Sequence, residues 1–116
     1  MGSSLYIHIP FCRRKCLYCN FYSDIYEDSL AASFLDALSA EARNLAGCNF
    51  HTIYIGGGTP TVLNKGLFTK LVKDLGALPK DGGCEFTVEA NPESLDEDKV
   101  KAMLDAGVNR LSIGVQ

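Results

Sequence analysis

Apolar and polar residues alternate along four short segments of the chain. These segments are residues 5–9, 52–55, 86–90 and 111–115. Alternation with a period of two is the pattern of a β-strand with one buried face. Between these segments, apolar residues recur every three or four positions, which is typical of amphipathic helices. The predicted order is therefore strand, helix, strand, helix, strand, helix, strand.

Residues at the ends of the periodic segments indicate where the helices begin and end. Asn64 is expected to cap the second helix, and Ser94 with Glu97 has the spacing of a capping box for the third. Gly47 and Gly107 are expected to end the first and third helices. The predicted buried faces are Leu30, Phe34, Leu38, Ala42 and Leu45; Leu67, Phe68, Leu71, Val72 and Leu75; and Leu95, Val100, Met103 and Leu104.

The alternation of strands and helices predicts an α/β fold with a parallel sheet and crossover helices. A parallel strand covered on both faces would be almost entirely apolar, whereas each strand here keeps one polar face. This favours a partial (β/α) barrel with helices outside and a ligand-holding lumen inside. A solvent-exposed sheet face would give the same alternation. Residues 1–116 are thus expected to form one truncated domain, about half a barrel, with an open sheet edge after Gln116.

Composition narrows the class of protein. The chain has 116 residues, 47% of them hydrophobic, and a net charge of −3. This size fits one domain, and the acidic balance argues against a nucleic-acid binder. The sequence has neither a signal peptide nor an apolar run long enough for a stable membrane helix, so a reducing, cytoplasmic compartment is expected. Cys48 and Cys84 are expected to be small buried apolar residues.

Three of the five cysteines, Cys12, Cys16 and Cys19, lie within eight residues. In a reducing compartment, such clusters bind metals or act in catalysis more often than they form disulfides. A structural zinc site needs a fourth ligand, which His8 or a distant cysteine could supply. A chance cluster or a disulfide is a further alternative. Three thiolates also suit three irons of a [4Fe–4S] cluster, whose fourth iron then stays open. Basic residues 13–15 form either a solvated loop tip or a positive charge beside an anionic cluster.

A glycine run, 56–58, continues into Thr59 and Pro60 just beyond the second strand. Glycines let a backbone approach a ligand closely and adopt positive φ, although a tight turn would use them equally well. The run and the cysteines both follow parallel strands, and ligands bind at the carboxyl edge of such sheets. The two segments are therefore expected to lie beside one ligand.

The spacing Cys12-x-x-x-Cys16-x-x-Cys19 resembles the cluster motif of the radical S-adenosylmethionine (SAM) superfamily. Within that superfamily, four segments look like the oxygen-independent coproporphyrinogen III oxidases and the related haem chaperones. These segments are residues 6–12, 56–60, 88–92 and 111–116. The resemblance covers essentially the whole chain and implies the N-terminal half of a radical SAM domain.

The resemblance implies two cofactors, a [4Fe–4S] cluster and SAM. SAM would chelate the open iron, and one electron from the cluster would cleave it to methionine and a 5′-deoxyadenosyl radical. Cys12, Cys16 and Cys19 match the cluster ligands. The implied SAM contacts are Tyr6, Tyr18, Gly57, Gly58, Thr59, Glu89 and Gln116. For Glu89 and Gln116, an ordinary polar residue at a strand end is the alternative.

Phe21 separates the two branches of this group. The oxidases carry a fourth cysteine two positions after the third, where this chain and the haem chaperones have phenylalanine. The resemblance thus favours a chaperone that binds haem and transfers it to an accepting protein, with an electron donor as a further partner. An oxidase that decarboxylates coproporphyrinogen III, and a structural zinc module, are the alternatives. Whether the protein is an enzyme stays open at this point.

Overall fold

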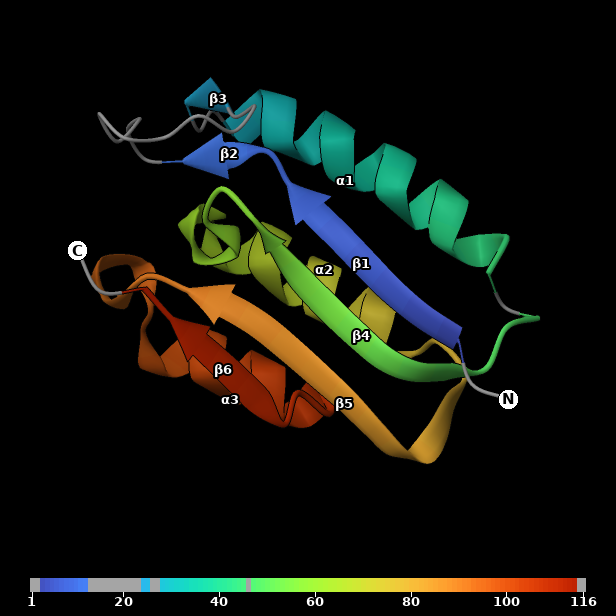
Figure 1. The fold of residues 1–116 in the computed structure, drawn as a ribbon. Helices are drawn as coiled ribbons and strands as arrows, with labels where there is room; N and C mark the ends of the chain where they lie inside the picture. Colours follow the sequence, from blue (N-terminus) through green and yellow to red (C-terminus); the bar gives the residue numbers. More distant parts are fainter. Residues whose placement is uncertain (1–2, 13–23, 26–27, 46, 115–116) are drawn as a thin grey trace.

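Three helices pack against one face of a parallel sheet (Figure 1). A computed structural model describes residues 3–12, 24–25, 28–45 and 47–114. The sheet has the order β1-β4-β5-β6, and every neighbouring pair is parallel. Its strands are β1 (Ser3–Ile9), β4 (Phe50–Gly57), β5 (Lys80–Ala90) and β6 (Arg110–Ile113). The predicted α/β class, element order and parallel sheet are therefore confirmed.

The helices follow the strands in the predicted order. They are α1 (Asp28–Arg43), α2 (Lys65–Gly76) and α3 (Glu97–Ala106). Short 3-10 turns, η1 (Pro60–Val62) and η2 (Pro92–Ser94), leave the carboxyl ends of β4 and β5. A second, two-stranded parallel sheet pairs β2 (Phe11–Cys12) with β3 (Asp24–Ile25) and was not predicted. None of the described helices combines the length and apolar character needed to cross a bilayer.

The apolar strand positions form the core with the helices, as predicted. The strand residues with at most 6% exposure on this face include Ile7, Ile9, Ile53, Ile55, Phe86 and Val88. They belong to one cluster with buried residues of α1 and α2. The prediction is wrong for Leu111 and Ile113, which are 42% and 51% exposed. Both lie on β6 at the edge of the sheet, where the described residues supply no further strand to cover them.

Two helices are rotated relative to their predicted faces. In α1 the buried residues include Ala31 and Leu35, whereas Leu30 is 47% exposed. In α3 the buried residues are Lys99 and Met103, whereas Leu104 is 69% exposed. An apolar stripe fixes a helical face only to within about one residue, and the packing partners decide the rest.

The helix ends were predicted with mixed success. Asn64 caps α2 as expected, since its Oδ1 accepts a 2.9 Å hydrogen bond from Leu67 N. Gly107 ends α3 with φ of 96°. The capping box at Ser94 is wrong, because Asp96 is the N-cap of α3 and accepts from Lys99 N at 2.8 Å. Gly47 does not cap α1, because the helix ends at Arg43.

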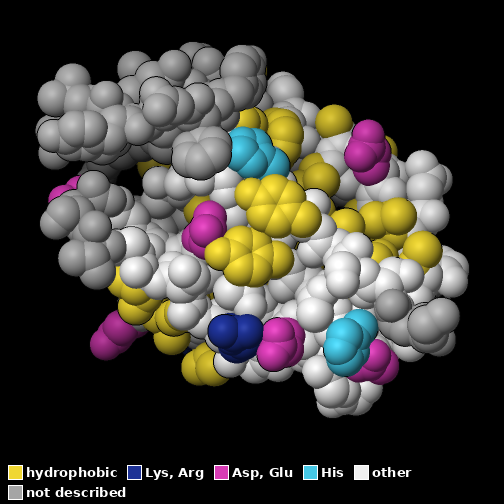
Figure 2. Space-filling model, viewed as in Figure 1, with side chains coloured by type: hydrophobic (Ala, Val, Ile, Leu, Met, Phe, Trp, Pro, Cys, Tyr) yellow, Lys and Arg dark blue, Asp and Glu magenta, His cyan; other side chains and the backbone are white. Residues whose placement is uncertain are grey.

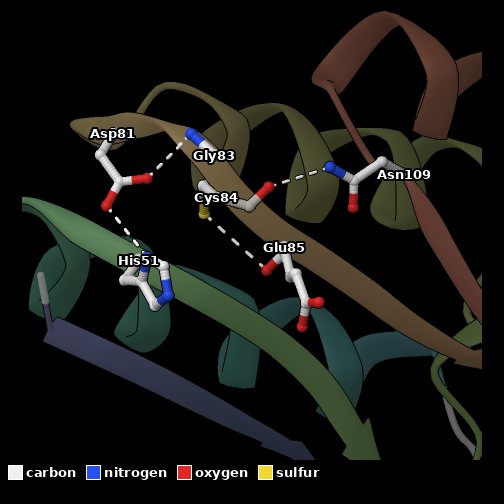
Figure 3. Close-up of polar contacts among 6 residues, drawn as sticks. All are labelled: His51, Asp81, Gly83, Cys84, Glu85 and Asn109. Carbon is white, nitrogen blue, oxygen red and sulfur yellow. Dashed lines mark hydrogen bonds and ion pairs between the residues drawn. The ribbon is translucent and has the colours of Figure 1, made fainter.

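At the amino-terminal end of the sheet, side-chain hydrogen bonds accompany a strand pairing whose register shifts between Phe50 and Thr52 (Figure 3). Asp81 accepts from Gly83 N at 3.0 Å and pairs with His51 at 3.1 Å. Asn109 Nδ2 donates to the carbonyl of Cys84 at 2.9 Å. β5 begins at Lys80, six residues before the strand that the sequence predicts at residues 86–90.

Candidate functional site

The carboxyl ends of all four long strands meet at one edge of the sheet, because the strands are parallel. The register pairs Ile9 of β1 with Gly57 of β4, and Glu89 of β5 with Ser112 of β6. Side chains of one parity therefore point to the face opposite the helices. This edge and face are where the sequence predicted the ligand site.

The glycine loop after β4 is joined by backbone hydrogen bonds to the chain that leads into the cysteines. Gly58 N donates to the carbonyl of Ile9 at 2.7 Å, and Thr59 N donates to that of Phe11 at 2.7 Å. Phe11 directly precedes Cys12. The predicted neighbourhood of the glycine run and the start of the cysteine segment is thus present.

Close approach explains the glycines themselves. Gly57 has φ of 110°, and a Cβ there would lie 2.7 Å from the carbonyl oxygen of Ile9. At Gly56 a Cβ would lie 2.5 Å from Glu89 Oε1. Both separations are far below van der Waals contact, so the loop leaves room for the carboxylate only because these side chains are absent.

Glu89 is oriented by donors from the neighbouring strand. Its Oε2 accepts from Tyr54 Oη at 2.8 Å, and its Oε1 accepts from Gly57 N at 3.0 Å. Each carboxylate oxygen has a further lone pair. Glu89 is therefore held as an acceptor that can bind additional hydroxyl or amino donors.

Two tyrosines extend this polar face toward β1. The register pairs Tyr6 with Tyr54, and their rings stack with centroids 5.8 Å apart and an angle of 20° between planes. Tyr6 is 56% exposed, and its Oη lies 3.4 Å from His8 Nδ1. Figure 2 shows this face, where hydrophobic rings lie next to acidic and histidine side chains.

The carboxylate also affects the ionisation of both phenols. The pKa of Tyr54 is raised, chiefly because its hydroxyl donates to Glu89 and also because of burial. The pKa of Tyr6 is raised by burial first and by the charge of Glu89 second. Both hydroxyls therefore stay protonated at neutral pH and remain hydrogen-bond donors.

A pocket of about 230 Å³ opens at this edge. It is lined by Gly57, Gly58, Thr59, Pro60, Glu89, Ala90, Asn91, Ser112 and Gly114. Complete small-molecule pockets usually measure about 300–1,000 Å³. The described residues therefore form part of a larger site, lined by backbone groups, the carboxylate of Glu89, the hydroxyls of Thr59 and Ser112 and the side-chain amide of Asn91.

Several predicted site residues, Tyr6 among them, do not line this pocket. Cys16, Tyr18, Cys19 and Gln116 lie outside the described residues, as does Phe21. Cys12 is described only through its backbone in β2. Among the described residues, no three histidine, cysteine, aspartate or glutamate side chains could hold a metal ion. The cluster ligands therefore stay a prediction.

Sequence reasoning missed Tyr54 as a site residue. Its place on the polar parity of the second strand was recognised, but nothing in that pattern indicated its bond to Glu89. That bond depends on the parallel register, which sets Tyr54 beside Thr87, two residues before Glu89. The sequence signal that could have identified Tyr54 is its position on the polar face of the strand, two residues before the glycine run.

Comparison with known proteins agrees with the geometry. The family model described as "Radical SAM superfamily" matches residues 6–116. Heme chaperone HemW of Bacillus subtilis is 42% identical over 97% of this chain and 31% of the relative. Oxygen-independent coproporphyrinogen III oxidase of Paracoccus denitrificans is 39% identical over 97% of this chain and 27% of the relative.

A solved structure resembles the fold closely. The structure described as coproporphyrinogen III oxidase (HemN) from Escherichia coli, a radical SAM enzyme, matches with a TM-score of 0.84 and 35% identity. The match covers 97% of this chain and 27% of that one. This chain thus spans between a quarter and a third of these proteins. From the family match over residues 6–116, the chain belongs to the radical SAM superfamily.

Proposed function

We propose that the pocket at the carboxyl ends of β4, β5 and β6 binds SAM, and that Cys12, Cys16 and Cys19 hold the [4Fe–4S] cluster beside it. The observation that carries this proposal is the carboxylate of Glu89, which Tyr54 and Gly57 N hold at 2.8 and 3.0 Å. A carboxylate with free lone pairs suits the two hydroxyls of a ribose.

The glycine loop of the pocket and a tyrosine on the neighbouring face fit the same ligand. Backbone at Gly57, Gly58 and Thr59 can approach the methionyl amino end of SAM, because the first two lack side chains. Tyr6 supplies an exposed aromatic ring and a protonated hydroxyl on the same face. Tyr18 and Gln116 are assigned further SAM contacts by family resemblance. When bound, the cluster and SAM supply one-electron chemistry, and the chain positions them and excludes water.

We further propose that residues 1–116 are the N-terminal half of the SAM-binding domain of a cytoplasmic haem chaperone. The similarity to HemW and the phenylalanine at position 21 support this assignment. Its partners would be haem, an electron donor and a haem-accepting protein. The second candidate is an oxygen-independent coproporphyrinogen III oxidase, which the 39% identity to the Paracoccus enzyme favours.

Anaerobic reconstitution tests the cofactor proposal. The gene product that carries these residues is expected to take up iron and sulfide, to turn brown, and to bind SAM in calorimetry. Glu89→Gln is expected to weaken SAM binding while the iron content stays unchanged. Uptake of zinc with neither iron nor sulfide would contradict the proposal.

A turnover assay separates the two candidate functions. With its cluster and SAM bound, the same protein is expected to bind haem, detected by its absorbance, and to leave coproporphyrinogen III unchanged. Measurable decarboxylation of coproporphyrinogen III would favour the oxidase instead. The Paracoccus relative serves as the positive control for the assay.

A further inference from the structure

The two walls of the pocket belong to separate loops. One wall is the segment from Gly57 to Pro60, which continues into η1, and the other is the segment from Glu89 to Asn91, which continues into η2. Where these segments leave the sheet, Gly57 N donates to Glu89, and Gly58 N and Thr59 N donate to the carbonyls of Ile9 and Phe11. Farther from the sheet, the width of the pocket also depends on what joins η1 to η2.

Lys99 of α3 forms hydrogen bonds to both η1 and η2. Its side chain is buried, with 7% exposure of the residue. Its Nζ donates to the carbonyl of Thr61 in η1 at 2.6 Å and to that of Ser94 in η2 at 2.8 Å. A buried ammonium is costly unless it is hydrogen-bonded, so these carbonyls are drawn to one point between the loops.

The hydroxyl groups of Thr61 and Ser94 also lie between η1 and η2. Together with Lys99 they form the loop junction. Thr61 Oγ1 accepts from Asn91 N at 3.1 Å and lies 2.7 Å from Ser94 Oγ. Ser94 Oγ also lies 3.2 Å from the carbonyl oxygen of Asn91, which it can reach as a donor. Thr61 has no exposed surface. Asn91 itself lines the pocket, so the junction acts directly on a residue of its wall.

We propose that Lys99 is a positioning residue that sets the separation between the two loops of the pocket. The proposal deepens the assignment above and rests on this pocket binding SAM. Only a group with several donors at one atom can bind carbonyls of two loops at the same point. A methionine of similar length would fill the space and leave both of these carbonyls without that donor.

The test compares Lys99→Met with two control variants in the reconstituted gene product. Lys101→Met removes an exposed lysine of the same helix. Met103→Ala removes a buried side chain of the same helix and destabilises the fold without touching the junction. Lys99→Met is expected to raise the Kd for SAM about tenfold or more, because misplaced binding groups are costly. Both controls are expected to keep the parental Kd, although Met103→Ala lowers the melting temperature.

Two further measurements separate positioning from general stability. Hydrogen exchange at the amide of Asn91, measured without cofactors, is expected to accelerate in Lys99→Met beyond any change in Met103→Ala. In Lys99→Ala, added methylammonium is expected to restore part of the lost SAM affinity, because it can occupy the place of Nζ.

Some results would overturn the positioning role of Lys99, and others would overturn the proposed function. A parental Kd in Lys99→Met, or an equal loss of affinity in Met103→Ala, overturns the positioning role. If the parent protein itself fails to bind SAM, the proposed function is wrong. The loop junction is then judged by exchange at Asn91 alone, and parental exchange in Lys99→Met would refute it.

Discussion

At the residue scale, the site depends on one carboxylate and the donors that orient it. Tyr54 Oη and Gly57 N come from β4 and reach Glu89 on β5. Tyr54 in turn stacks on Tyr6 of β1. Three strands are thus connected through adjacent polar side chains, and a change at one of them is expected to be measurable at the next.

The ionisation of Tyr54 provides the first prediction. Its pKa lies above the ordinary value of 10.0, chiefly because of the hydrogen bond to Glu89. Glu89→Gln is expected to lower this pKa toward 10.0, because the neutral amide stabilises the protonated phenol less. Carbon-13 NMR of labelled tyrosine measures it, with Tyr54→Phe to assign the resonance and the exposed Glu93→Gln as control. An unchanged Tyr54 titration in Glu89→Gln would contradict the prediction.

The same shift has a consequence for stability. A group whose pKa is raised on folding binds its proton more tightly in the folded state. The contribution of the Tyr54–Glu89 bond is therefore fully present below pH 10.0 and is lost as the pH rises through the higher folded value. Denaturant melts at alkaline pH are expected to lose stability less steeply in Tyr54→Phe than in the parent.

Gly57 provides a second prediction at this scale. Alanine there would combine positive φ with a Cβ 2.7 Å from a backbone oxygen. Gly57→Ala is expected to destabilise the fold by about 2 kcal/mol or more. Gly66→Ala is the matched control, because its nearest neighbour would lie 3.6 Å away in ordinary contact. That substitution in α2 is expected to be neutral or slightly stabilising. Equal urea midpoints for the two variants would contradict this account.

At the scale of elements, a side chain completes the pairing of β5 with β6. Asn109 lies just before β6, and its amide group accepts from Phe86 N at 2.9 Å and donates to the carbonyl of Cys84 at 2.9 Å. Its own backbone N donates to the carbonyl of Phe86. Asn109 thus extends the hydrogen bonding between β5 and β6 beyond their first regular pair, Thr87 and Arg110.

The amide group is therefore expected to matter more than the size of the side chain. Asn109→Asp replaces the donor to the Cys84 carbonyl with an oxygen and is expected to cost about 1–3 kcal/mol. Asn44→Asp, at an exposed position after α1, is expected to change stability by less than about 0.5 kcal/mol. Chemical denaturation of both variants checks the difference, and equal losses would rule out this role of Asn109 in strand pairing.

At the scale of the whole molecule, the sheet has an open, apolar edge in the part that the structure describes. Leu111 and Ile113 of β6 are 42% and 51% exposed, and Leu104 of α3 is 69% exposed. Exposed strand edges pair with other chains unless charge or cover prevents it. Residues 1–116 alone are therefore expected to self-associate.

Sedimentation of the isolated 1–116 chain tests this edge. Ile113→Lys is expected to shift the distribution toward monomer, because a charge on the edge opposes strand pairing. Leu30→Lys is the control, since Leu30 is similarly exposed at 47% but lies on α1. A chain that sediments as a clean monomer without substitution would count against the partial-barrel arrangement.

Local patterns were sufficient to predict the long strands, the helices and their order. A period of two or of 3.6 residues is a property of neighbouring positions, so the four long strands, the three helices and the buried parity of Ile53 and Phe86 followed from the sequence. The same local information placed Glu89 on the polar face. It was less reliable for helix rotation, where Leu104 was expected inside and Lys99 lies there instead.

What the sequence determined by itself is therefore the α/β order, the polar face of the sheet and the family motifs. Only the tertiary structure decided which side chains meet, because contacts between strands depend on a register that no single segment encodes. The bond from Tyr54 to Glu89 and the stack on Tyr6 follow from that register. The burial of Lys99 has a similar cause, since its acceptors, the carbonyls of Thr61 and Ser94, come together only after β4 and β5 pair.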